Sequence, residues 1–204
     1  MNLLDHYSRL HEFIQERIKK DIYPEPPSQL HTGITEKMVE RLNTHQSLAG
    51  KKILDCGCGQ GIALELFRSK GAEAIGTTFG EDHRICKEKG FEVYEMDQSF
   101  LDFAPNTFDA LWCRHALEHS LFPLFTLRGF YEVLKPDGIL YLEMPAPDTA
   151  CRHETNQNHY SCFTKNAWTS LIERSGFSIF DYTDIQFTVP AGPDHYYSFF
   201  CKKN

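Results

Sequence analysis

The stretch LDCGCGQG, residues 54–61, places one acid, two cysteines and three glycines within eight positions. These residue types suit a metal knuckle, a redox pair of thiols, or a backbone loop that holds a cofactor. A C-x-C pair supplies only two of the four ligands that a structural zinc ion takes, and this stretch has no C-x-x-C redox motif. We therefore interpret Cys56 and Cys58 as small residues that fill a tight space.

The glycines of this stretch have the spacing of a cofactor loop. Gly57, Gly59 and Gly61 stand between a short apolar run and a helical pattern, so backbone N–H groups there can approach a ligand at a helix N-terminus. A dinucleotide fingerprint requires G-x-G-x-x-G, whereas this sequence has G-x-G-x-G. Asp55 would repel a pyrophosphate but attract a cation, such as the amino group of a methionine moiety.

Two further motifs resemble metal sites. HALEH, residues 115–119, matches the inverted zinc-protease signature, but His115 ends a predicted strand and no third ligand is evident, so we reject a zinc hydrolase. The second set has a spacing that is not a standard zinc knuckle, and we interpret it as a polar loop over the active site. It comprises Cys151, His153, His159 and Cys162. We predict no bound metal.

The chain around these motifs alternates between strand and helix patterns. Such alternation predicts a parallel sheet covered on both faces, with two final strands forming an antiparallel pair at one edge and ligands at the carboxyl ends of the strands. The predicted strands are 51–55, 72–78, 91–97, 108–115, 138–145, 177–185 and 195–203. The predicted helices are 3–20, 34–47, 62–71, 81–90, 123–135 and 165–176, the last capped by Thr164.

The composition sets further bounds. A chain of 204 residues is enough for one domain, which we divide into an N-terminal helical lid or extension, 1–48, and a cofactor-binding core, 49–204. A net charge of -7 disfavours nucleic acid and anionic lipid as partners. The sequence has no signal peptide or membrane span, so we expect a cytoplasmic protein whose seven cysteines are thiols.

Five motifs occur in a characteristic order: ILDCGCGQG, MDQSF, FDALWCRHALEH, EVLKPDGILYLEMP and HYSCFTKNAWTSLIERSGF. Together they resemble the class I S-adenosylmethionine-dependent methyltransferases, in particular the small-molecule branch of UbiE-like and sugar or natural-product enzymes, over residues 50–204. The resemblance implies an α/β, Rossmann-like sheet of seven mostly parallel strands with an antiparallel last strand and helices on both faces. It also implies S-adenosylmethionine as cofactor and methyl transfer to an oxygen or nitrogen of a small molecule.

The resemblance also implies cofactor contacts. In that family the glycine loop holds the methionine part, the acid closing the third strand binds the adenine amino group, and the turn after the fourth strand approaches the sulfonium. Carried onto this sequence, these roles fall to Asp55, Gly57, Cys58 by its backbone, Gly59 and Gly61, to Asp97 with Gln98 beside it, and to Arg114 and His115.

The sequence departs from the family at the end of the second strand. The family places an acid there for the ribose hydroxyls, whereas this chain has Thr78, so Glu81 or Asp82 would have to complete the contact. Phe79 could pack on the adenine face. The missing acid leaves two alternatives, an NADP-dependent reductase, for which Arg84 lies too far along the chain, and a catalytically silent relative of the fold.

Histidine is the side chain best suited to take a proton from an acceptor hydroxyl at neutral pH. His119 and His159 follow the fourth and fifth strands, and we favour His159 as the base because it precedes the helix capped by Thr164. The N-terminal segment and the loop 145–163 should form a substrate lid. Its aromatic residues Tyr7, Phe13, Tyr23 and Tyr160 suit a small polar or cyclic acceptor.

Overall fold

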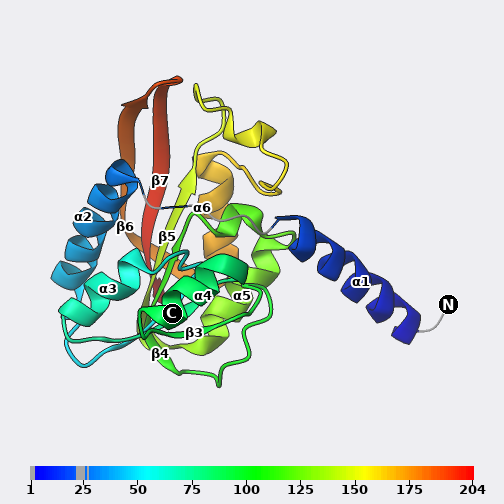
Figure 1. The fold of residues 1–204 in the computed structure, drawn as a ribbon, viewed down its shortest axis with the longest axis horizontal. Helices are drawn as coiled ribbons and strands as arrows, with labels where there is room; N and C mark the ends of the chain where they lie inside the picture. Colours follow the sequence, from blue (N-terminus) through cyan, green and yellow to red (C-terminus); the bar gives the residue numbers. More distant parts are fainter. Residues whose placement is uncertain (1–2, 22–25, 27) are drawn as a thin grey trace.

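The computed structural model describes residues 3–21, 26 and 28–204 (Figure 1). Seven strands form one sheet in the order β3-β2-β1-β4-β5-β7-β6. Every pairing is parallel except those that β7 makes with β5 and β6, which confirms the predicted sheet with its antiparallel last strand. The strands are β1 (Lys52–Cys56), β2 (Glu73–Thr77), β3 (Glu92–Tyr94), β4 (Phe108–Arg114), β5 (Leu134–Pro145), β6 (Phe177–Val189) and β7 (Gly192–Lys203).

Helices cover both faces of the sheet, as predicted. The helices are α1 (Leu3–Asp21), α2 (Gln29–His45), α3 (Ile62–Ser69), α4 (Gly80–Glu88), α5 (Pro123–Val133) and α6 (Lys165–Arg174), with two short 3-10 turns, η1 (Leu117–His119) and η2 (His153–Thr155). Apolar residues of α5 and α6 pack on one face, and those of α2 and α3 pack on the other. In Figure 1, α1 extends away from this layered body.

The core follows from the alternation of side chains along the strands. On one face, Leu111 packs with Phe130 of α5 and Trp168 of α6. On the other, Trp112 stacks on Tyr141 with ring centroids 3.9 Å apart and meets Phe67 of α3 edge to face. Both faces of the central strands are therefore dry, which is why those strands read as continuous apolar runs.

Several element boundaries differ from those predicted. The helix expected at 34–47 begins at Gln29, because Ser28 caps it by accepting a hydrogen bond from the backbone N–H of His31 at 3.1 Å. The strand expected at 91–97 ends at Tyr94, because its one neighbour, β2, ends at Thr77, the residue paired with Tyr94. Thr164 occupies the N-cap position of α6, but its side chain makes no capping hydrogen bond.

Candidate functional site

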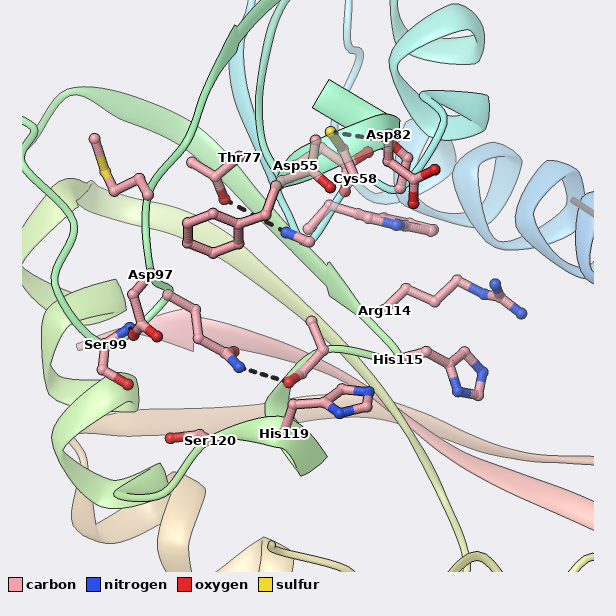
Figure 2. Close-up of a pocket in the computed structure, with 18 of the residues that line it drawn as sticks. Asp55, Cys58, Thr77, Asp82, Asp97, Ser99, Arg114, His115, His119 and Ser120 are labelled. Atoms are coloured by element: carbon pink, nitrogen blue, oxygen red, sulfur yellow. Dashed lines mark hydrogen bonds between the residues drawn. The ribbon is translucent and has the colours of Figure 1, made fainter. Parts of the chain in front are cut away.

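A cavity of about 310 Å³ opens at the carboxyl ends of β1, β2 and β4 (Figure 2). Its wall includes the loop after β1, the residues after β2, the segment after β3 and the turn after β4. In Figure 2, Asp97 and Ser99 lie on one side, Arg114 and His115 on the opposite side, and Asp55 and Cys58 above them. The position agrees with the rule that ligands of parallel sheets bind beyond the carboxyl ends of the strands.

The three glycines of the loop all have left-handed backbones, but their surroundings differ. Gly57 (φ +79°), Gly59 (φ +49°) and Gly61 (φ +85°) are all left-handed. A Cβ on Gly57 would stand 2.5 Å from the Cβ of Ala116, so this glycine permits contact between two loops. A Cβ on Gly59 would enter open space at the cavity wall.

Gly61 does not line the cavity. A Cβ there would lie 3.1 Å from both Cys86 Sγ of α4 and Phe91, so this position is explained by packing against those two residues. Cys56 and Cys58 are buried, as expected of small residues in a tight space. All seven cysteines lie in the described ranges and are free thiols.

Asp55 is the buried acid of the cavity. It is only 3% exposed and lines the wall next to the glycine loop. Burial, with a smaller contribution from Cys86, raises the pKa of Asp55 well above its ordinary value, and Arg114 partly opposes that shift. A cationic group entering the cavity would offset the desolvation of this carboxylate.

The opposite wall offers hydrogen-bond acceptors. Asp97 Oδ1 accepts from the backbone N–H of Ser99 at 2.7 Å, so the residue forms an Asx turn and also faces the cavity. Gln98 donates from Nε2 to the carbonyl of Ala116 at 2.6 Å, and its Oε1 is buried without a hydrogen-bond partner in the described part of the chain. That orphaned acceptor would be satisfied by an N–H or O–H group of a ligand.

The residues that follow β2 are those considered for the ribose of the cofactor. Thr78 and Phe79 both line the cavity, and Thr78 is held by a backbone hydrogen bond from its N–H to Tyr94 O at 3.1 Å. Asp82 also lines the cavity, is buried, and accepts from Gln60 Nε2 at 3.0 Å. Glu81 instead pairs with Arg84 on the exposed side of α4. Of the two acids considered from the sequence, Asp82 is therefore the one at the cavity.

A buried charge network lies behind the turn after β4. Arg114 Nε stands 2.7 Å from Glu143 Oε1, and its Nη2 is buried with no hydrogen-bond partner among the described residues. His115 adopts φ +50° and places its ring between Glu143 at 3.0 Å and Glu118 at 3.5 Å. Burial and Arg114 disfavour a charged ring, but the two carboxylates outweigh them and raise the pKa of His115.

Of the two candidate bases, only His119 lines the cavity. Its Nδ1 lies 2.9 Å from the carbonyl oxygen of Asn158. His159 does not line the cavity and instead meets His119 edge to face, with ring centroids 4.9 Å apart. Burial lowers the pKa of His159, and its Nδ1 has no hydrogen-bond partner within the described ranges. The two alternative bases are therefore neighbours, and the one that lines the cavity is His119, which the sequence favoured less.

The candidate metal ligands fall into two separate groups. Within each group, the donor atoms lie within 4.8 Å of one another. One group is Glu118, His119 and His159, and the other is Cys151, His153 and Asp194. The set considered from the sequence is thus divided: Cys151 and His153 meet an aspartate that the motif did not contain, and Cys162 belongs to neither group.

The N-terminal segment contributes to the cavity through residues that the sequence did not single out. Ile14, Arg17, His31 and Thr35 all line it. His31 Nε2 lies 3.1 Å from the hydroxyl of Tyr196, and its ring stacks on His115 at 5.8 Å. Of the predicted lid aromatics, Tyr160 lines the cavity, Tyr7 and Phe13 are exposed away from it, and Tyr23 lies outside the described residues.

Comparison with known families decides the class to which this arrangement belongs. The methyltransferase domain family matches residues 29–181, more than half of the chain. The chain belongs to the methyltransferase domain family. Its predicted class and cofactor, S-adenosylmethionine, are confirmed at the level of that family, and neither alternative finds support.

Two curated relatives of this methyltransferase domain have the same name. The chain is 30% identical over 127 residues to a ubiquinone biosynthesis O-methyltransferase from Methylococcus capsulatus, which covers 57% of this chain and 54% of that protein. It is 34% identical over 113 residues to the protein of the same name from Pseudomonas putida, covering 50% and 48%. The chain therefore spans about half the length of the curated relatives it matches.

Solved structures confirm the fold of the methyltransferase domain. A SAM-dependent methyltransferase from Archaeoglobus fulgidus matches with a TM-score of 0.69 at 19% identity, covering 84% of this chain and 94% of that one. The [4+2]-cyclase SpnF matches with a TM-score of 0.72 at 20% identity, covering 90% and 84%. Because a cyclase shares the fold, the reaction has to be argued from the site.

In the described ranges, none of the helices has the length and apolar character of a membrane span.

Proposed function

We propose that this chain transfers the methyl group of S-adenosylmethionine to a hydroxyl oxygen of a small molecule. The observation that carries the proposal is the meeting, in one cavity, of a cofactor-type glycine loop and a histidine with a defined tautomer. The names of the curated relatives favour oxygen over nitrogen as the acceptor atom. The free thiols support the cytoplasm as the compartment.

The cavity wall fits the cofactor's chemistry at both ends. Asp55 presents a buried carboxylate that suits an ammonium group, and Gly59 leaves open space beside the backbone. On the far side, Asp97 and the orphaned Oε1 of Gln98 suit the exocyclic amine of a purine, with Phe79 available to pack on its ring. When bound, the cofactor supplies a methyl group already activated by a positively charged sulfur. The assignments to Gly57, Cys58, Gly61, Thr78, Arg114 and His115 remain predictions.

The chain's remaining tasks are to align the acceptor and to remove its proton. A carbonyl oxygen can only accept, so Asn158 fixes the proton of a neutral His119 on Nδ1. The opposite nitrogen, Nε2, is then the basic one, and we assign to it the uptake of the hydroxyl proton. His159, which packs edge to face on His119 outside the cavity, is assigned the role of holding that ring in place.

The arrangement of the loop supports this assignment. Ser161 donates its backbone N–H to Glu118 O at 3.0 Å and its hydroxyl to Ser120 O at 3.0 Å. These two bonds fasten the loop that carries His159 directly to the turn that carries His119. The pair is thus held by rigid backbone contacts, which a proton-accepting site requires.

The test has two stages on the full chain. Calorimetry should detect binding of S-adenosylmethionine and of S-adenosylhomocysteine. Transfer of a labelled methyl group should then be measured on paired acceptors that differ only in a hydroxyl or an amine at the same position. We expect labelled ethers from the hydroxyl members. Absence of cofactor binding, or label on the amines alone, would overturn the proposal.

A further inference from the structure

A second cluster of chemically active side chains lies outside the cavity, between the loop 146–163 and the start of β7. Cys151, His153 and Asp194 bring a sulfur, an imidazole nitrogen and a carboxylate oxygen within 4.8 Å of one another. None of the three lines the cofactor cavity, so the methyl-transfer chemistry leaves them unexplained. We propose that these three side chains bind one zinc ion, with water as its fourth ligand.

The carboxylate is the first reason. Asp194 is only 4% exposed, and its side chain accepts a hydrogen bond from the backbone N–H of His195 at 2.9 Å, which fixes its orientation. Among the ion pairs of the described residues, none joins Asp194 to a lysine or arginine. His153 Nε2 faces both carboxylate oxygens, at 2.9 and 3.1 Å. This contact is an ion pair when the imidazole is protonated, and a metal ion held by both groups would take the place of that proton.

The backbone is the second reason, because it fixes the positions of the three residues relative to one another. Arg152, between Cys151 and His153, adopts the left-handed conformation with φ +51°, which a non-glycine residue rarely holds. The loop is hydrogen-bonded to β7 on both sides of the cluster, from Ala150 N to Pro193 O and from Ala146 N to His195 O, each at 3.1 Å. The two ligands from the loop and the one from β7 are therefore presented from fixed backbones.

The ligand types select the metal. Thiolate, imidazole and carboxylate together are the donors that zinc takes. Three protein ligands leave a fourth position for water, so this would be an open zinc site and not a closed structural site of four protein ligands. Cys151 and His153 are only half-buried, so the fourth position and an entry path face the surface. The same loop carries His159 and Tyr160, so a zinc ion here would set the position of the lid without touching the reacting atoms.

The experiment measures metal content and spectra of the full chain. After dialysis against a chelator and reloading with Zn²⁺, elemental analysis should find one zinc per chain. Loading with Co²⁺ should give the charge-transfer absorption of a thiolate ligand. Cys151→Ser and Asp194→Asn should weaken Zn²⁺ binding by at least about 100-fold, since loss of an outer-shell partner alone already weakens it 10- to 100-fold.

Cys162→Ser is the matched control, because Cys162 is a half-buried cysteine of the same loop outside the cluster, and it should keep the zinc. Retention of zinc by Cys151→Ser and Asp194→Asn would overturn the proposal, as would its loss in Glu118→Gln, which would place the metal at the other histidine group. Should those variants fail to fold, the cobalt spectrum of the unaltered chain decides, because a spectrum without thiolate absorption excludes Cys151 as a ligand.

Discussion

The ring of His119 donates its Nδ1 proton to the main-chain oxygen of Asn158 across 2.9 Å. Because the acceptor is a main-chain carbonyl, the neutral ring has one tautomer, with Nε2 unprotonated. A histidine in a flexible loop would divide its population between two tautomers, whereas this contact favours the one with its proton on Nδ1.

Replacement of His119 should therefore reduce turnover without weakening cofactor binding. Loss of a general base lowers rates by about 10² to 10⁴. His119→Asn is the most informative variant, because its side-chain amide can still donate to Asn158 O yet has no basic nitrogen. We expect it to lose as much activity as His119→Ala, with calorimetry showing unchanged affinity for S-adenosylmethionine.

His159→Ala is the comparison for this pair. Because His159 only supports the ring of His119, we expect a smaller loss of turnover, and one that varies with the size of the substrate. Full activity in His119→Asn together with a large loss in His159→Ala would reverse the two assignments.

Gly59→Ala should weaken cofactor binding while leaving the fold intact. The new methyl group enters open space at the cavity wall, so no protein atom opposes it. Its left-handed backbone makes alanine unfavourable by about 1 kcal/mol. Gly90→Ala is the matched control, because Gly90 is also left-handed (φ +73°), also faces open space, and lies outside the cavity.

Thermal denaturation should show similar losses for Gly59→Ala and Gly90→Ala, and calorimetry should show at least tenfold weaker cofactor binding for the first alone. Equal affinities in the two variants would remove Gly59 from the cofactor site. Gly57 is unsuitable for this test, because its Cβ would collide with Ala116 and disturb the fold itself.

Thr78→Asp should tighten the binding of S-adenosylmethionine by about tenfold, since a carboxylate can accept from both ribose hydroxyls and charged hydrogen bonds are worth about 1.5–3 kcal/mol. Thr78→Asn provides a control of the same shape without the charge and should bind nearly as the unaltered chain does. Weaker binding in Thr78→Asp would mean that the nearby Asp82 already fills the ribose position and repels a second acid.

Cofactor affinity should fall as the pH is lowered through the raised pKa of Asp55, because burial favours the protonated acid, which cannot pair with an ammonium group. The stability of the cofactor-free protein should change in the opposite sense. A carboxyl whose folded pKa is raised binds more protons when folded, so its contribution to stability declines as the pH rises from its ordinary value of 3.8 through the folded pKa.

Asp55→Asn separates these two effects. At neutral pH, the cofactor-free variant should melt at a higher temperature than the unaltered chain, because folding no longer has to desolvate or protonate a carboxylate. It should also bind S-adenosylmethionine more weakly. The difference in melting temperature should shrink toward pH 4. A difference that stays constant with pH would show that folding does not raise the pKa of Asp55.

The order of strands and helices was predictable because it depends on local pattern. Apolar runs of four to eight residues, separated by helical periodicity and glycine stops, are properties of neighbouring residues. The same holds for the position of the glycine loop, since Asp55 and Gly57 stand at the end of an apolar run. Resemblance to a family then supplied the roles that no local pattern encodes.

The site's finer relations were not predictable because they join residues far apart in the sequence. The collision that requires glycine at 57 comes from Ala116, and the tautomer of His119 is set by Asn158. Asp194 completes a cluster whose other members, Cys151 and His153, lie about forty residues earlier in the chain. Sequence spacing alone could not identify such partners, since each contact joins two segments that only the folded chain brings together.

The position of β7 has a consequence for the order in which the sheet can be completed. β7 lies between β5 and β6, so β6 joins the sheet only through β7, although it is made first. During synthesis on the ribosome, the long edge of β5 must remain open, and β6 must wait unpaired, until β7 emerges. Exposed strand edges are templates for association between chains. Nascent chains stalled between Val189 and Lys203 should therefore be the species most in need of a chaperone.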